Sequence, residues 1–160
     1  MELTDGVVTL RTPALADADD ITEALQDPAM SRWLLRVPSP YRREHAVEFI
    51  EIARRGERDS FVAEADGRLV AAGSVTNGEM GYWVAPWAQG RGIGTRVVTL
   101  LRDWAHAERG LDRIELLIHP DNAPSIRLAE KAGFSDTGEL RVPDRGTNPP
   151  PHLVYAWSAE

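Results

Sequence analysis

The sequence predicts an α/β (α+β) fold in which one mixed, mostly antiparallel sheet of about seven strands is flanked by about four helices. Two dipeptides that favour tight hairpins, Asp66-Gly67 and Asn77-Gly78, separate short apolar runs in the middle of the chain. On either side, segments with period-two alternation of apolar residues mix with segments at helical spacing. No repeat or polar linker divides the 160 residues, so we expect a single domain over residues 1–160.

The first third of the chain predicts one strand and two helices. Apolar and polar residues alternate over residues 7–12, which is typical of a half-buried strand. Asp17 precedes apolar residues at helical spacing and is expected to cap a helix. A second helix is predicted to begin at Ser39 and Pro40, a typical N-cap and first-turn pair, and to end at Gly56.

The rest of the chain predicts a three-stranded meander followed by two helices and three more strands. These elements are expected at residues 61–63, 69–71 and 80–84 (strands), from a glycine-rich turn at 90–94 to Gly110 (helix), at 113–118 (strand), at 124–132 (helix), from Phe134 onward and at 153–157 (strands). A proline-rich loop, residues 143–151, separates the last two strands and is expected to be exposed.

Composition excludes several classes of function. The formal charge of −7 argues against a nucleic-acid partner, because phosphate backbones require clustered cations. No run of about 18 apolar residues and no secretory signal is found, which predicts a cytoplasmic protein without a membrane partner. The absence of cysteine excludes disulfides and thiolate chemistry, and the four scattered histidines lack metal-ligand spacing, so we expect no metal site.

The glycine-rich segment from Gln89 to Thr95, between a strand and a helix, is the strongest functional signal. Glycines allow backbone N–H groups to approach an anion, and the following helix N-terminus adds a partial positive charge, so a pyrophosphate would fit there. The segment lacks the Gly-Lys-Ser/Thr ending of a P-loop. It is also no dinucleotide fingerprint, because the third glycine is replaced by Thr95 and the preceding strand is antiparallel to its neighbour.

Two segments together resemble the GNAT acetyltransferases. Gln89-Gly90-Arg91-Gly92-Ile93-Gly94 is similar to their Gln/Arg-x-x-Gly-x-Gly/Ala signature, and Asp121–Ser125 with Glu130–Phe134 resembles the second signature, especially in the Rim branch that acetylates N-terminal amines of ribosomal proteins. The resemblance implies a sheet splayed between its fourth and fifth strands. It also implies acetyl-CoA-dependent transfer of an acetyl group to a primary amine, either an N-terminal amine or that of a small molecule, and a possible homodimer.

The resemblance also implies a set of cofactor-binding residues. Amides of the glycine-rich turn are expected to hold the pyrophosphate, the preceding strand to pair with the pantetheine arm, and the amide of Val84 to face the thioester oxygen as an oxyanion donor. Asn122 is expected either to contact the cofactor or to cap the following helix. The implied cofactor contacts are Trp83, Val84, Ala85, Gln89, Gly90, Arg91, Gly92, Ile93, Gly94, Thr95, Asn122 and Ser125.

The resemblance identifies the catalytic groups less directly than the cofactor contacts. Glu79 is expected to act through water as general base, the alternative being a solvated strand end. Ala129 stands where many family members carry a tyrosine that protonates the departing thiolate, so Ser125 or a water that it orders is the substitute. Trp33 and Tyr82 are expected at the acceptor site, although the sequence favours a packed aromatic residue over a catalyst at Tyr82.

Two other functions stay open on the sequence. The missing tyrosine motivates an acyl-CoA-binding sensor without turnover. The glycine-rich turn alone would also suit nucleotide binding.

Overall fold

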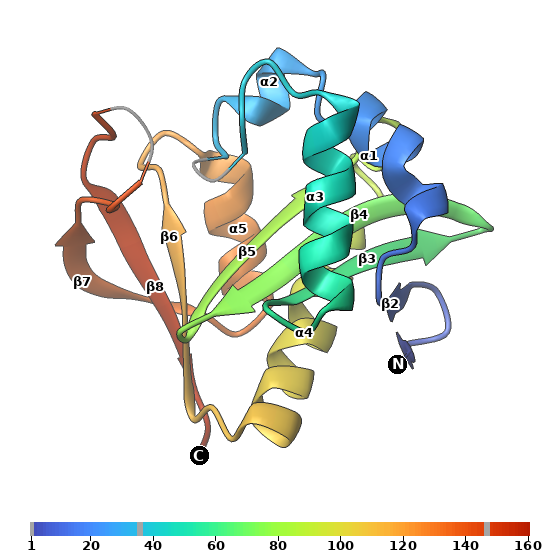
Figure 1. The fold of residues 1–160 in the computed structure, drawn as a ribbon. Helices are drawn as coiled ribbons and strands as arrows, with labels where there is room; N and C mark the ends of the chain where they lie inside the picture. Colours follow the sequence, from blue (N-terminus) through green and yellow to red (C-terminus); the bar gives the residue numbers. More distant parts are fainter. Residues whose placement is uncertain (1, 35–36, 146–147) are drawn as a thin grey trace.

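A computed structural model describes residues 2–34, 37–145 and 148–160, and it contains one open, eight-stranded sheet (Figure 1). The strand order is β1-β2-β3-β4-β5-β6-β8-β7, and all neighbours are antiparallel except β5 and β6. The strands are β1 (Glu2–Thr4), β2 (Thr9–Arg11), β3 (Asp59–Ala65), β4 (Arg68–Thr76), β5 (Glu79–Val84), β6 (Arg113–Ile118), β7 (Ser135–Arg141) and β8 (His152–Ser158). The predicted fold class is confirmed, with β1 as an additional edge strand.

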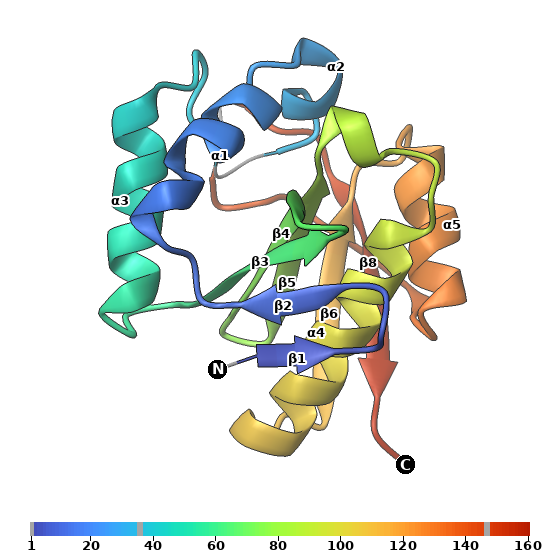
Figure 2. The same ribbon diagram turned by 90° about the vertical axis from the view of Figure 1, so that its right-hand side faces the viewer.

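Helices cover both faces of this sheet (Figure 2). On one face lie α1 (Ala18–Ala24) and α3 (Arg43–Arg54), joined through α2 (Pro28–Ser31); on the other lie α4 (Ile93–Arg109) and α5 (Ala123–Lys131). Two 3₁₀ turns, η1 (Leu15–Asp17) and η2 (Pro86–Ala88), precede α1 and α4. Neighbouring strand residues point to opposite faces, so Val62 belongs to the core under α1 and α3, whereas Phe61 and Ala63 belong to the core under α4.

Both early helices begin differently from the prediction. Asp17 does not cap α1, because its carboxylate accepts two 2.8 Å hydrogen bonds from Arg11 and one of 2.7 Å from the N–H of Ala14. The second helix, α3, begins at Arg43 rather than at Ser39-Pro40, and the ring Nδ1 of His45 accepts the N–H of Arg42 there.

The hairpins form as predicted. Asp66 and Gly67 have φ values of 54° and 73°, and Asn77 and Gly78 have values of 50° and 79°. Positive φ at both central residues is the mark of the type I′ turn, whose twist matches that of the flanking strands. The two turns therefore make β3, β4 and β5 a continuous antiparallel meander.

The parallel neighbours β5 and β6 touch at one end only. Their pairing consists of Glu79 opposite Glu115, where the N–H of Glu115 donates to the carbonyl of Gly78 at 2.8 Å. Beyond that point the strands diverge (Figure 1). The splay implied for the fourth and fifth strands of the predicted sheet is thus present between β5 and β6.

Candidate acyl-transfer site

The divergence turns one edge of β5 toward an open gap. The N–H of Ala85 bonds to the carbonyl of Val70 in β4 at 2.8 Å, while the carbonyl of Gly78 faces β6. Backbone groups alternate in direction along a strand, so the N–H and C=O of Tyr82 and Val84 face the gap. An extended ligand can pair with this free edge as an added strand does.

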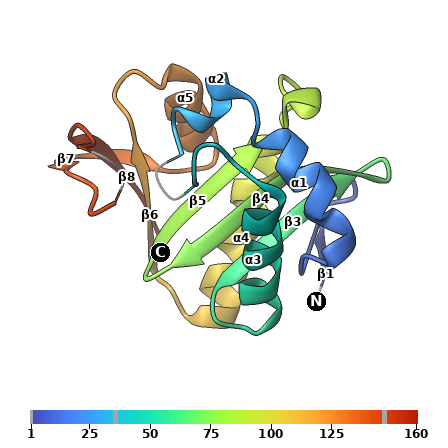
Figure 3. The same ribbon diagram turned by 45° about the horizontal axis from the view of Figure 1, so that its top comes forward.

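A cavity of about 610 Å³ occupies the gap and continues to both faces of the sheet. Glu79 and Trp83 share their strand parity and face the α1 and α3 side, whereas Tyr82 and Val84 pack on the α4 and α5 side. All four line the same cavity, because no continuous ladder closes the sheet between β5 and β6. Figure 3 shows α2 and α5 near the end where the strands diverge.

The glycine-rich turn lies beside the gap and begins α4. Gly90 and Gly92 have φ values of 75° and 72°, which non-glycine residues adopt only at a cost. Gly94 is glycine for another reason: an added Cβ would lie 2.5 Å from Cδ1 of Leu128 and 3.3 Å from Cγ2 of Val84. Amides at the first turn of α4 face outward without an intrahelical acceptor, as at every helix start, which suits an anion.

Polar side chains of the turn are held in place by short contacts. The side-chain amide of Gln89 donates to the carbonyl of Val84 at 2.8 Å. Arg91 pairs with Asp66 at 3.3 Å, and both side chains are exposed. Gln89 thus occupies one lone pair of a carbonyl that faces the gap, and it holds the turn against the end of β5.

Two hydroxyl groups meet on the α5 side of the cavity. The hydroxyls of Tyr82 and Ser125 lie 2.8 Å apart, and both residues line the cavity. Burial raises the pKa of Tyr82 above its usual 10.0, against a smaller opposite effect of the bond to Ser125. Tyr82 is therefore protonated at neutral pH. Ala129 is fully buried and brings no hydroxyl here.

Asn122 has the capping role that the sequence left open. Its side-chain oxygen accepts from the N–H of Ser125 at the start of α5, at a long 3.4 Å. It also lines the cavity, so the cap leaves the rest of the amide group exposed to a ligand.

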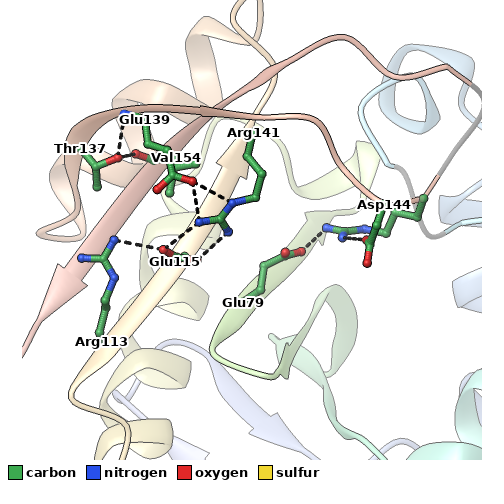
Figure 4. A network of polar contacts seen from close by, with 9 residues as sticks. Glu79, Arg113, Glu115, Thr137, Glu139, Arg141, Asp144 and Val154 are labelled. Carbon is green, nitrogen blue, oxygen red and sulfur yellow. Dashed lines mark hydrogen bonds and ion pairs between the residues drawn. The ribbon is translucent and has the colours of Figure 1, made fainter.

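An ion pair closes the opposite side of the cavity. Glu79, at the start of β5, binds Nη2 of Arg145, which comes from the loop after β7. Each side chain is about one fifth exposed. Figure 4 shows Glu79 directed toward the segment that carries Asp144, which accepts from Nη1 of Arg145 at 3.1 Å. The expected general base is thus already paired with a cation.

An aromatic wall follows β6 on the same side. The ring of Trp33 lies 5.0 Å from that of His119, which in turn lies 5.4 Å from the ring of the buried His152. Sequence reasoning missed His119 and Arg145 as cavity residues, because both depend on segments that are distant in sequence and meet only in the folded chain.

The cavity brings together part of the predicted site. Eight of the expected residues line it: Trp33, Glu79, Tyr82, Trp83, Val84, Gln89, Asn122 and Ser125. The others lie outside its lining, in or next to the turn: Ala85, Gly90, Arg91, Gly92, Ile93, Gly94 and Thr95. This division suits a ligand with a long arm in the gap and an anionic group at the turn.

The part of the chain that the structure describes has neither a cluster of metal ligands nor a helix that could span a membrane. No cluster of three or more histidine, aspartate or glutamate side chains there is arranged to hold a metal ion. Within those same residues, every helix is too short or too polar for a membrane crossing.

Comparisons with known proteins agree on one family. The model of the acetyltransferase (GNAT) domain matches residues 8–135. The uncharacterized N-acetyltransferase p20 of Bacillus licheniformis is 28% identical over 146 residues, which cover 84% of this chain and 82% of that protein. RimJ of Mycobacterium smegmatis, solved in complex with CoA-disulfide, superposes with a TM-score of 0.78 at 26% identity, covering 96% of this chain and 83% of that one. The ribosomal-protein-S5-alanine acetyltransferase of Vibrio fischeri superposes with a TM-score of 0.81 at 18% identity, covering 100% of this chain and 97% of that one.

Proposed function

Since the chain belongs to the GNAT acetyltransferase family and is an N-acetyltransferase, we propose that it transfers the acetyl group of acetyl-CoA directly to a primary amine. The amine is an N-terminal amine or that of a small molecule. The observation that carries the proposal is the free edge of β5 along a cavity that passes through the sheet. Residues 1–160 are proposed to act as one domain, in the cytoplasm, alone or as a homodimer.

The residues of the gap fit acetyl-CoA. When bound, acetyl-CoA supplies a thioester carbonyl that an amine can attack and a thiolate that can leave. The gap-facing N–H of Val84 is suited to donate to the carbonyl oxygen, as the single oxyanion donor. The outward amides of residues 91–95 are suited to the pyrophosphate. Trp83 and Asn122 line the cavity, whereas the expected backbone contact of Ala85 is not available, because its N–H is bonded to Val70.

Glu79 is proposed as the base that takes the proton of the amine through water. At pH 7 the deprotonation of an α-amine with a pKa of about 8 costs roughly 1.4 kcal/mol, against about 4.6 kcal/mol for a lysine side chain. Glu79 shares the α3 face with Trp33 and His119, so the amine is proposed to enter from that face.

Tyr82 and Ser125 are proposed as the group that meets the departing thiolate. Their hydroxyls form a connected pair on the α5 side, opposite Glu79, and burial keeps Tyr82 protonated. A hydroxyl pair supplied by β5 and α5 would thereby replace the tyrosine that is absent at Ala129.

A ligand screen followed by an activity assay tests this proposal. Saturation with CoA at 100 times its dissociation constant should add about 2.7 kcal/mol to stability, while NAD and ATP should add nothing. With acetyl-CoA and a panel of amines, free thiol should be released. Stabilisation by CoA without thiol release from any amine would instead support an acyl-CoA sensor, and stabilisation by ATP or NAD alone would support nucleotide binding.

The Glu79→Gln variant tests the base. We expect turnover to fall mainly below about pH 8, where the amine must be deprotonated, with the affinity for CoA unchanged. An unaltered pH–rate profile would remove Glu79 from the mechanism.

A further inference from the structure

Arg145 is a cation placed inside the acceptor side of the cavity. Two arginines among the described residues line this cavity, and Arg58 is exposed whereas the side chain of Arg145 is only about one fifth exposed. Its Nη1 and Nη2 atoms bind Asp144 and Glu79, but its buried Nε has no hydrogen-bond partner among the described residues. A guanidinium group binds a carboxylate best through two parallel N–H donors, so this one has an unused donor beside a used one.

The proposed reaction brings a second cation to the carboxylate of Glu79, whose Oε2 atom already binds Arg145. A substrate ammonium group that binds the carboxylate of Glu79 competes for it with the guanidinium group of Arg145. If Arg145 then found no other anion, a largely buried cation would keep only its contact with the exposed Asp144, which is unfavourable. A substrate that carries its own carboxylate removes that cost. Its ammonium group then pairs with Glu79 while its carboxylate pairs with Arg145, so two ion pairs replace one.

We propose that Arg145 is a specificity-determining residue that selects acceptors carrying a carboxylate next to the amine, that is, free amino acids or related small zwitterions. This inference rests on the proposed function and narrows its acceptor class. In the free enzyme, Glu79 and Arg145 neutralise each other. In the complex, the ammonium group faces Glu79 and the carboxylate faces the Nε and Nη2 atoms of Arg145. Arg145 takes no part in bond making; it positions the acceptor.

Three acceptors with the same isobutyl side chain test the selectivity: leucine, leucinamide and isoamylamine. We expect kcat/KM of the wild-type protein to be about 10- to 100-fold higher for leucine than for the two compounds without a carboxylate. Leucinamide is the weaker base of the first two and is more easily deprotonated, so a preference for leucine cannot come from the reactivity of the amine. Equal values, or a preference for leucinamide, would overturn the inference.

Variants assign the preference to one side chain. In Arg145→Met, the ratio of kcat/KM for leucine to that for leucinamide should fall to about 1. Arg145→Lys should keep part of the preference, since a lysine retains the charge without the paired donors. The ratio is taken within each variant, so a general loss of folded protein cancels. Arg141→Met is the matched control, because Arg141 pairs with Glu115 at 2.8 Å outside the cavity lining, and its ratio should stay that of the wild type. A ratio that survives in Arg145→Met would refute the assignment.

Calorimetric titration of the three compounds into the protein measures the same selectivity without turnover. Tighter binding of leucine that is lost in Arg145→Met supports the inference even if no thiol is released, in which case it is the proposed function that fails. Thiol release with equal affinities for all three compounds would leave the proposed function standing and reject the role of Arg145.

Discussion

Single contacts decide the chemistry that this cavity can perform. The 2.8 Å contact between Tyr82 and Ser125 joins a residue of β5 to a residue of α5, so neither hydroxyl is oriented alone. Glu79 lies on the other face of the same strand, three residues before Tyr82. The expected acid and base are therefore separated by the sheet itself, with the gap between them.

The hydroxyl pair predicts coupled losses of activity. Ser125→Ala and Tyr82→Phe should each lower kcat about tenfold, since a thiolate leaves with little assistance, and the affinity for CoA should change little. The double variant should lose less than the product of the two, with a coupling energy of about 1 kcal/mol, because each single change already breaks the shared contact. A double-mutant cycle on kcat measures this coupling, and strictly additive losses would show that the two hydroxyls act independently.

At the scale of elements, the turn before α4 is specified by backbone conformation. Gly92 is the N-cap residue of α4 and has a φ of 72°, and open space surrounds the position that a Cβ would occupy. Gly94, two residues further along the chain, is specified by packing against Leu128 instead. The two glycines of one motif therefore have different physical reasons, which the motif alone does not distinguish.

Substitutions at Gly92 test whether glycine is required there by the backbone conformation or by a steric contact. Gly92→Ala should lower the free energy of unfolding by about 1–2 kcal/mol, the cost of a left-handed conformation for a residue with a Cβ. At roughly 2–4 °C per kcal/mol for a chain of this size, Tm should fall by about 2–8 °C. Gly92→Asn should lose clearly less, because asparagine tolerates this region. Thermal unfolding of the three proteins checks the order, and equal losses for both variants would argue for a steric cause.

Across the whole molecule, ion pairs fasten the strands beyond the gap to one another. Glu115 of β6 accepts from Arg141 of β7 at 2.8 Å and from Arg113 at 3.0 Å, which links strands on either side of β8 (Figure 4). These bonds hold the pKa of Glu115 below its usual 4.5, and the bond from Arg141 has the largest effect. Burial acts in the opposite direction.

That shift predicts how stability depends on pH. The folded state binds the proton of Glu115 more weakly than the unfolded state, so this contribution is complete above pH 4.5 and disappears as the pH falls through the lowered folded-state pKa. Glu115→Gln should therefore cost about 1 kcal/mol at pH 7 and progressively less in acid. Thermal unfolding of the wild type and the variant from pH 7 to pH 3 measures the cost at pH 7 and its decrease in acid. Glu139→Gln, a change at a half-exposed partner of Arg141, is the control and should run parallel to the wild type.

Local patterns predicted most of the fold, because its elements are specified locally. The type I′ dipeptides determined the meander, and the apolar period of β6 determined its bounds, 113–118. The pattern missed β1, since three residues are too few to show a period. It misassigned Asp17, whose preferred partner, Arg11, is brought near by the turn between β2 and η1. Glu79 and Ser125 were predicted as site residues from resemblance, but the pairing of Glu79 with Arg145 is tertiary and left no local signal.

An opening that reaches both faces of a sheet also bears on the order of events. If the coenzyme and the acceptor approach from opposite faces, neither obstructs the other's route. Initial-rate plots should then intersect, as they do when both substrates bind before any product leaves. A conjugate in which an amine is tethered to the sulfur of CoA would span the sheet through the gap. Its affinity should far exceed that of either half, because the second half binds at the high effective concentration that a tether provides.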